Sequence, residues 1–208
     1  GHFDERAATW DESPQNVHRA AVIAKAIRAA VTLDGTERVL EYGAGTGLVS
    51  QVLRDHVGAL TLADVSRGMR AVIESKIETG VLGGATVWDI DLAAAAPPAG
   101  AQFDLIVTVM TLHHVADVAP VLDAFARLLA PGGHLCVADL EEEDGAFHGE
   151  GFHGHHGFGR TELTEALVAA GFSEPEYSVP YHVDRDGRQY PVFLAVASAA
   201  AQPSGTSS

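Results

Sequence analysis

The chain has 208 residues, of which 47% are hydrophobic and 20% charged, and this composition predicts a single α/β domain large enough to bury a core. Its formal net charge of -15 disfavours nucleic acid and anionic membranes as partners, so we expect a small molecule to be bound instead. The apolar runs are too short to cross a membrane and no signal peptide opens the sequence, which predicts a cytoplasmic protein.

An N-terminal arm, residues 1–12, precedes the first predicted helix. The arm is mostly polar but carries Trp10. Ser13 and Pro14 are typical of a helix start, with serine as the cap and proline as the first helical residue. Apolar residues then recur at helical spacing, so a helix is predicted over residues 14–31.

A glycine-rich loop follows the first predicted strand. Residues 38–47 read Arg-Val-Leu-Glu-Tyr-Gly-Ala-Gly-Thr-Gly, and a helix is predicted over residues 48–56. Glycines at alternate positions permit positive φ angles and let a ligand approach the backbone. A phosphate site would disfavour an anion such as Glu41 beside the helix N-terminus, and a dinucleotide site would need glycine in place of Leu48. The loop therefore predicts a cationic ligand without phosphate.

The second predicted strand, residues 60–63, ends at Asp64. At this place in an open α/β sheet a carboxylate can accept hydrogen bonds from both hydroxyls of a ribose. A helix over residues 69–79 and a short third strand over residues 86–88 come next.

Residues 103–109 are nearly all apolar, which is typical of a strand buried on both faces of a parallel sheet. Ligands bind beyond the carboxyl ends of such strands, so His113 and His114 lie where catalysis would take place. Histidine, with a pKa of about 6.5, can take a proton near neutral pH. Alternatively, either imidazole hydrogen-bonds the backbone and only shapes the pocket.

Asp117 indicates the start of the next helix, which is predicted as far as Leu129. A Pro-Gly-Gly turn at residues 131–133 leads into a fifth strand that we expect to end at Asp139. Cys136 in this strand is the single cysteine, which excludes a disulfide framework and a cysteine metal site.

A long loop rich in glycine and histidine, residues 141–159, follows the fifth strand. Loops of this length are usually functional or disordered. Its aromatic residues could wall an apolar pocket: Phe147, Phe152 and Phe158. Its histidines could contact substrate or bind a metal together with a carboxylate: His148, His153, His155 and His156. They have no familiar zinc spacing, so we expect no metal and keep a mobile polar cap as the alternative.

The chain is predicted to close with a helix and a hairpin. Thr161 is expected to cap the helix, and two strands over residues 177–183 and 190–197 are joined by an Asp-Gly turn. The domain is then expected to cover residues 1–198, and the small and polar residues 199–208 to form a flexible tail.

Several of these segments together resemble the class I S-adenosylmethionine-dependent methyltransferases. The matching segments are Glu-x-Gly-x-Gly-x-Gly at residues 41–47, Asp-x-Ser-x-x-Met at residues 64–69, Leu-x-Pro-Gly-Gly at residues 129–133 and the closing hairpin. The histidine segment is similar to that of the methyltransferase 11 type, which includes the ubiquinone and menaquinone C-methyltransferases. The resemblance covers residues 7–197. It implies a Rossmann-like, seven-stranded, mostly parallel sheet with a C-terminal antiparallel hairpin and helices on both faces.

The resemblance also implies S-adenosyl-L-methionine as cofactor and S-adenosyl-L-homocysteine as product. The cofactor-binding residues that it implies are Trp10, Glu41, Gly43, Ala44, Gly45, Gly47, Asp64, Val65, Met69, Asp89, Ile90, Asp91 and Val109. In the family an acid after the third strand accepts the adenine amino group, and the sequence leaves Asp89 and Asp91 both open. Trp10 could be a lid residue or only anchor the arm on the core.

These observations predict methyl transfer to a small molecule, with His113 or His114 removing a proton from the acceptor. One alternative is a non-catalytic protein on the same fold that binds S-adenosylmethionine or a metal. A second is an NAD(P)-dependent oxidoreductase, which Glu41, Leu48 and the closing hairpin disfavour. The acceptor atom, C, N, O or S, and the oligomeric state are left open.

Overall fold

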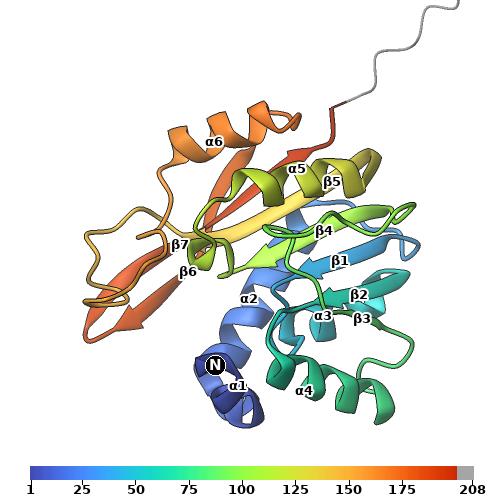
Figure 1. The fold of residues 1–208 in the computed structure, drawn as a ribbon, viewed down its shortest axis with the longest axis horizontal. Coiled ribbons are helices and arrows are strands. Elements are labelled where there is room, and N and C mark those ends of the chain that lie inside the picture. The colour runs from blue at the N-terminus through green and yellow to red at the C-terminus, as the bar shows by residue number, and fades with distance from the viewer. Residues whose placement is uncertain (201–208) are drawn as a thin grey trace, which may run out of the picture.

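The computed structural model describes residues 1–200, which form a seven-stranded sheet with helices packed on both faces (Figure 1). The strands are β1 (Arg38–Tyr42), β2 (Ala59–Ala63), β3 (Thr86–Trp88), β4 (Phe103–Val109), β5 (Leu129–Leu140), β6 (Glu176–Arg185) and β7 (Arg188–Ser198). Their order in the sheet is β3-β2-β1-β4-β5-β7-β6. Strands β1 to β5 pair in parallel, whereas β7 is antiparallel to β5 and β6 is antiparallel to β7. The predicted mostly parallel sheet with a closing hairpin is confirmed.

The helices cover the sheet because successive residues of its central strands point to opposite faces. They are α1 (His2–Arg6), α2 (Pro14–Ala30), α3 (Leu48–Leu53), α4 (Arg67–Glu78), α5 (Ala119–Leu128) and α6 (Arg160–Ala169), with 3-10 turns η1 (Ala7–Glu12), η2 (Arg54–His56) and η3 (Leu112–His114). In β1, Leu40 packs with α5 and α6, while its neighbour Val39 packs with α2 and α3. Each central strand is thus buried on both sides, which explains the continuous apolar run of β4.

Several predicted boundaries differ from the structure. The Pro-Gly-Gly segment expected as a turn before the fifth strand lies inside β5, which ends at Leu140 and not at Asp139. At α5 and α6, contacts distant in sequence override the local pattern. The helix expected to reach Leu129 ends one residue earlier, since Leu129 already pairs with Phe103 as the first residue of β5. The residue at the N-cap of α5 is Val118, although the Asp117 carboxylate does accept a hydrogen bond from the Ala119 N–H at 3.1 Å.

The start of α6 also differs from the prediction. Gly159, not Thr161, is the cap residue, and Thr161 lies inside the helix. The reason is that Phe158 donates its N–H to the Leu140 carbonyl at 2.9 Å, which ends the preceding loop and lets the helix begin directly after it. Phe158 therefore packs in the core below α5 and α6 and not in a pocket wall.

The two ends of the described chain are both attached to the fold. The predicted arm forms α1 and η1, which pack against α4. Of the predicted tail, Ala199 donates to the Gly133 carbonyl at 2.9 Å and Ala200 to the Gly171 carbonyl at 3.2 Å. The remainder of that tail, residues 201–208, lies outside the described residues. No helix within residues 1–200 combines the length and apolar character needed to span a bilayer.

Candidate functional site

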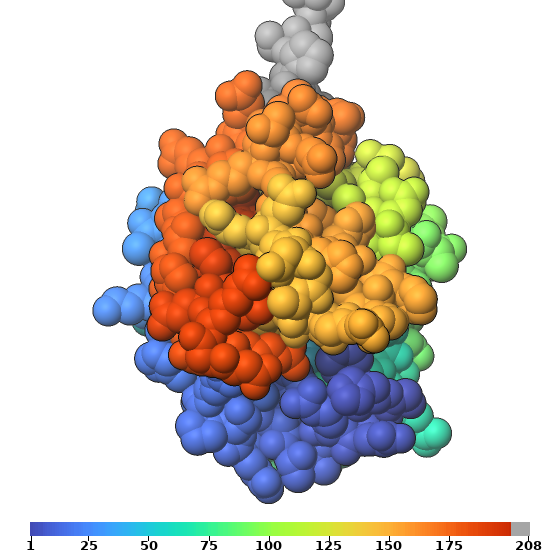
Figure 2. Space-filling view, turned by 90° about the vertical axis from the view of Figure 1, so that its left-hand side faces the viewer, coloured from blue at the N-terminus to red at the C-terminus, as the bar shows by residue number. Residues whose placement is uncertain are grey.

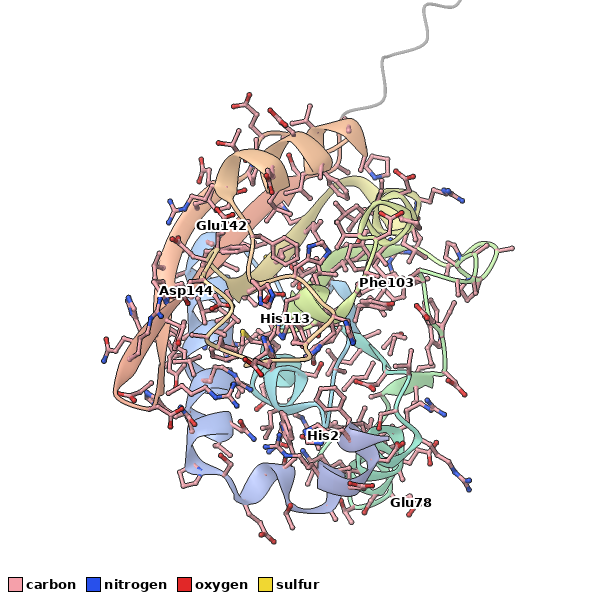
Figure 3. All side chains as sticks on the ribbon, turned by 60° about the vertical axis from the view of Figure 1, so that its left-hand side comes forward. His2, Glu78, Phe103, His113, Glu142 and Asp144 are labelled. Atoms are coloured by element: carbon pink, nitrogen blue, oxygen red, sulfur yellow. The ribbon has the colours of Figure 1, made fainter. Side chains whose placement is uncertain are left out.

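A cavity of about 1120 Å³ lies beyond the carboxyl ends of the parallel strands. Its floor consists of the loops that follow β1, β2, β3 and β4, and its walls include the arm (residues 1–12) and the cap loop (residues 141–159). Figure 2 shows the arm, in dark blue, next to the cap loop, in gold and light orange. Figure 3 shows His113 next to the cap loop, with His2 of the arm lower in the view. We call the end lined by residues 43–46 the glycine side and the end lined by His113 and His148 the histidine side.

Glu41, the last acidic residue before the glycines, belongs to β1, and its side chain lies at the N-terminus of α3. Its carboxylate accepts hydrogen bonds from the Ser50 N–H at 3.0 Å and from the Ser50 hydroxyl. The side chain is buried, and burial raises its pKa to about 7. A carboxylate therefore already caps the helix end at which a dinucleotide-binding protein would place a phosphate.

Two glycines of the loop are required for different reasons. A Cβ on Gly43 would lie 2.2 Å from the Thr111 side chain, whose hydroxyl donates to the Gly43 carbonyl at 3.1 Å, so this glycine lets the loop meet the end of β4. A Cβ on Gly47 would lie 2.8 Å from Leu62, so Gly47 faces the core and not the cavity. Both have positive φ angles, 69° and 82°.

Asp64 is held at the end of β2 by two backbone hydrogen bonds. One carboxylate oxygen accepts from the Gly45 N–H and the other from the Ser66 N–H, each at 2.8 Å. Each oxygen keeps a second lone pair for a ligand. Burial raises the pKa of this carboxyl above its usual value.

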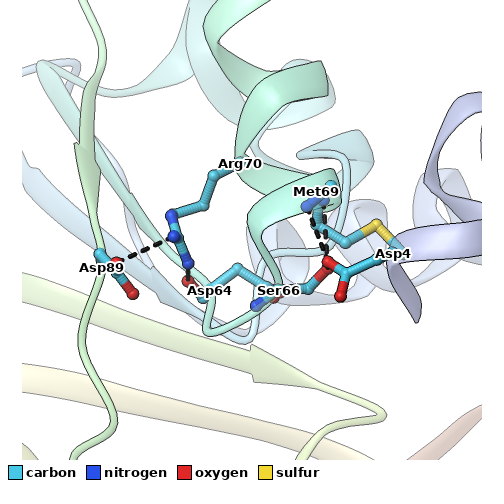
Figure 4. Close-up of polar contacts among 7 residues, drawn as sticks. Asp4, Asp64, Ser66, Met69, Arg70 and Asp89 are labelled. Carbon is cyan, nitrogen blue, oxygen red and sulfur yellow. Dashed lines mark hydrogen bonds and ion pairs between the residues drawn. The ribbon is translucent and has the colours of Figure 1, made fainter. Parts of the chain in front are cut away.

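The two acids after β3 lie in different places. Asp91 lines the cavity, as does Ile90 before it. Asp89 instead pairs with Arg70 at 2.8 Å, its side chain is 69% exposed, and it does not line the cavity (Figure 4). Arg70 also donates to the Asp64 carbonyl at 2.8 Å. Asp89 and Arg70 therefore stabilise the loop after β2 without lining the cavity themselves.

Of the cofactor-binding residues predicted from sequence, the cavity brings most together. Those that line it are Trp10, Glu41, Gly43, Ala44, Gly45, Asp64, Val65, Met69, Ile90, Asp91 and Val109. Gly47 and Asp89 lie outside it.

The arm is fastened to the glycine side by two carboxylates. Asp4 accepts hydrogen bonds from the Ser66 hydroxyl at 2.7 Å and the Gly68 N–H at 2.8 Å (Figure 4). Asp11 accepts from the Thr46 hydroxyl at 2.5 Å and pairs with Lys76 at 2.6 Å.

The aromatic residues of the arm extend from there to the histidine side. The Phe3 ring lies 6.2 Å from the Trp10 ring and 5.3 Å from the His114 ring, centroid to centroid. The arm therefore covers the cavity from the glycine loop to the histidines.

On the histidine side, His113 is held by a buried carboxylate. Its Nδ1 lies 2.6 Å from an oxygen of Asp139, whose other oxygen accepts the His113 backbone N–H at 3.2 Å. His113 and Asp139 are both buried. The carboxylate fixes the ring, with Nε2 as the nitrogen that it does not engage.

Two further imidazoles surround His113. The ring centroids of His114 and His148 lie 4.0 and 4.8 Å from that of His113. Burial lowers the pKa of each of these two rings to about 4, so both are neutral near pH 7. In that state a ring nitrogen can accept a proton or bind a metal.

The other histidines of the cap loop stand apart from this cluster. His155 donates its backbone N–H to the His113 carbonyl at 2.7 Å, and His156 Nδ1 lies 3.4 Å from Glu143. Among residues 1–200, the group of side chains placed to share a metal ion consists of His113, His114 and His148. The histidines considered from sequence for a metal site thus contribute one member, His148.

Sequence reasoning missed two residues that shape the histidine side. The local sequence pattern marks Asp139 only as the end of a strand. The ends of neighbouring parallel strands lie together, however, so an acid after β5 and a histidine after β4 are a usable signal. Arg19 of α2 lines the cavity near Asp139 and Tyr181, and burial lowers its pKa. An arginine on a helix face carries no local signal of such a role.

A family model described as a methyltransferase domain matches residues 15–190 of the chain. Among curated proteins, the ubiquinone biosynthesis O-methyltransferase of Xylella fastidiosa is 34% identical over 122 residues, which are 58% of this chain and 48% of that protein. An uncharacterized methyltransferase of Schizosaccharomyces pombe is 32% identical over 118 residues, 53% of this chain and 41% of that protein. The chain thus spans about half the length, or less, of these relatives.

Solved structures share the fold at low sequence identity. Magnesium protoporphyrin IX methyltransferase from Synechocystis PCC 6803, solved with bound SAH, has a TM-score of 0.66 and 16% identity, and covers 89% of this chain and 84% of its own. The [4+2]-cyclase SpnF has a TM-score of 0.70 and 19% identity, and covers 88% of this chain and 81% of its own.

Proposed function

The chain belongs to the family of methyltransferase domains, as the sequence predicted, and on this premise we propose that it transfers the methyl group of S-adenosyl-L-methionine to a small-molecule acceptor. One observation carries the proposal: a single cavity contains both halves of a methyl-transfer site. Its glycine side offers acidic side chains and exposed loop backbone to a ligand, and its histidine side offers an imidazole that is oriented by a carboxylate. The solved structure with bound SAH supports the cofactor.

The glycine side suits a cationic ligand that carries a ribose and no phosphate. Glu41 already engages the N-terminal turn of α3 with its carboxyl group, so the free N–H groups that a dinucleotide site needs there are not available. Asp64 has free lone pairs on both oxygens for a pair of hydroxyls, and Asp91 and Ile90 provide a place for a purine. Trp10 covers this side from the arm.

S-adenosyl-L-methionine, when bound, supplies an electrophilic methyl group, so the protein forms no covalent bond. The side chains would orient an acceptor atom toward that methyl, and in the metal-free chain His113 Nε2 takes the proton that the acceptor releases. Asp139, at 2.6 Å from Nδ1, stabilises the imidazolium that forms. S-adenosyl-L-homocysteine would be the second product of this transfer.

The histidine side supports a small acceptor with a polar group. Phe3, Phe147 and Phe152 give it apolar walls, and Arg19 and Arg185 give it positive charge. The formal net charge of -15 disfavours nucleic acid, and the name of the Xylella relative favours a small molecule.

One alternative has an observation in its favour. The [4+2]-cyclase SpnF has the same fold, so this fold also occurs in a protein named for a different reaction. A non-catalytic role, or another reaction, on the same cofactor site is therefore the second candidate. Glu41 at the helix end and the antiparallel hairpin count against an NAD(P)-dependent oxidoreductase.

Isothermal titration calorimetry with S-adenosylmethionine tests the cofactor. We expect saturable binding to the parent chain and at least about tenfold weaker binding to Asp64→Ala, because hydrogen bonds to a charged group contribute about 1.5–3 kcal/mol. Asp55→Ala is the matched control, since the Asp55 side chain is 81% exposed and lies outside the cavity. NADH should not bind.

Two results would contradict the proposal: no binding of S-adenosylmethionine, or equal affinity in Asp64→Ala and Asp55→Ala. Formation of S-adenosylhomocysteine with a library of small phenols, amines and carboxylic acids then separates the enzyme from the non-catalytic alternative. Binding without any product across the library would favour that alternative.

A further inference from the structure

Three imidazoles converge at the histidine side of the cavity. His113 and His114 come from η3, and His148 comes from the cap loop. Each offers one ring nitrogen, and these nitrogens all lie within 4.8 Å of one another. We propose that this cluster binds one divalent transition-metal ion, such as zinc or cobalt, inside the cavity.

Asp139 prepares His113 for this role. The carboxylate engages Nδ1 at 2.6 Å and leaves Nε2 as the nitrogen for an ion. Metal-binding histidines are regularly oriented in this way by a carboxylate on the other ring nitrogen. Asp139 is itself fixed, because it also accepts the backbone N–H groups of His113 and of Leu140.

His148 supplies a second, independent observation. Its Nδ1 is buried and has no hydrogen-bond partner among the described residues. A buried polar atom without a partner is costly, and an ion is one partner that would satisfy it. The ring also stacks on Phe152 of the same loop, with a centroid distance of 3.7 Å and an interplanar angle of 8°.

The nitrogen atoms of the three rings lie slightly farther apart than they would around a bound ion. Metal–nitrogen bonds of about 2.0–2.1 Å put neighbouring ligand atoms roughly 3.4 Å apart, so binding must draw the rings together by about an ångström. The cap loop can provide this movement, because Gly149 and Gly151 follow His148. His114 is the exposed member of the cluster, so an ion can reach it from solvent.

The donor set decides the kind of ion. Imidazole nitrogens favour zinc, cobalt, nickel or copper over magnesium and calcium, which prefer oxygen. Three protein ligands leave at least one coordination position open, and it would face the cavity. An oxygen or nitrogen of a small molecule, or water, would complete the site.

The proposal does not depend on methyl transfer, and it changes how histidine variants are interpreted. A histidine whose Nε2 holds an ion cannot accept a proton there. In metal-loaded protein, activity lost on substitution of His113 would report loss of the ion and not loss of a base.

Metal titration of the full chain, purified without an affinity tag and freed of metal with EDTA, tests the site. We expect one equivalent of cobalt(II) to give a saturable visible absorption band, and one equivalent of zinc to bind in calorimetry. His148→Ala should bind at least about tenfold more weakly. His153→Ala is the matched control, because His153 is exposed in the same loop and outside the cluster.

Several outcomes would overturn the metal site. These are absence of saturable binding, equal binding by His148→Ala and the parent, or an equal loss in His153→Ala, which would mean adventitious binding to the histidine-rich loop. Far-ultraviolet circular dichroism checks that both variants fold. S-adenosylmethionine binding is measured on the same samples, so that failure of the cofactor proposal is seen separately.

Discussion

Glu41 shows, at the scale of a single residue, a conflict between stability and site chemistry. The side chain is buried and accepts two hydrogen bonds from Ser50, yet burial still raises its pKa to about 7. The ionised form is therefore less favourable in the folded chain than in the unfolded chain. Buried acids of this kind are concentrated at functional sites, where charge is needed despite its cost.

This conflict predicts a pH-dependent stability. The folded pKa of about 7 lies above the usual 4.5, so the stability contributed by the protonated carboxyl is present below pH 4.5 and is lost as the pH rises through 7. Glu41→Gln, which keeps a neutral group of the same shape, should raise the free energy of unfolding by about 2 kcal/mol more at about pH 8 than at about pH 5.5.

Urea unfolding of the cofactor-free chain at the two pH values measures this difference. Glu78→Gln removes the same charge at an exposed position on α4 and serves as the control, with no pH-dependent gain expected. An equal effect of Glu41→Gln at both pH values would show that the carboxyl is ionised without strain in the folded chain.

The glycine side could be expected from sequence residue by residue, whereas the histidine side could not. Glu41, the glycines and Asp64 lie on consecutive strand and loop segments, so their chemistry follows from local order. The partnership of His113 with Asp139 and His148 requires the pairing of β4 with β5 and the path of a loop without periodicity. Neither is encoded in a local pattern.

At the scale of elements, boundaries set by local sequence were predicted correctly, and boundaries set by long-range pairing were not. Strands β3 and β4 were predicted to the residue, because each is a compact apolar segment between turn residues. The predicted C-terminal end of α5 and start of α6 are wrong, because Leu129 and Phe158 join extended backbone contacts with distant segments. Long-range pairing decides an element's end wherever the local preference is weak.

The arm is the element whose role most needs a test. Asp11 joins it to the glycine loop through Thr46 and to α4 through Lys76. If the arm closes the glycine side, loss of this ion pair should weaken cofactor binding. Asp11→Asn is expected to lower the affinity for S-adenosylmethionine about two- to fivefold, since a partly exposed ion pair contributes about 0.5–1 kcal/mol.

Calorimetry on Asp11→Asn and on Glu12→Gln gives the comparison, because Glu12 is an exposed neighbour that does not line the cavity. Trypsin cleavage after Arg6 supplies a second readout: the cofactor should slow it in the parent and less so in Asp11→Asn. Unchanged affinity and unchanged protection would mean that the arm is docked independently of the site.

At the scale of the whole molecule, strand order explains why one cavity contains both sides. The chain runs outward from β1 to β3 and then returns to pair β4 with β1, so the loops after β1 and β4 diverge at the centre of the sheet. The arm and the cap loop then close this crevice from opposite ends of the sequence. Composition and periodicity indicate an α/β sheet, but this order was available from sequence only through the family resemblance.

The net charge of the molecule predicts its response to salt. A formal charge of -15 on 208 residues implies self-repulsion in the compact state, which screening weakens. Raising sodium chloride from about 0.02 to about 0.5 M should relieve about 1 kcal/mol of this repulsion and raise the melting temperature by about 2–4 °C.

Differential scanning calorimetry in the presence of EDTA measures this shift without contribution from a bound metal. Potassium chloride should give the same shift as sodium chloride, because screening depends on ionic strength and not on the cation. Salt also weakens exposed ion pairs such as Arg38–Asp104 and Arg160–Glu141, which acts in the opposite direction. A melting temperature that falls with salt would therefore mean that these surface pairs outweigh the repulsion among the acidic residues.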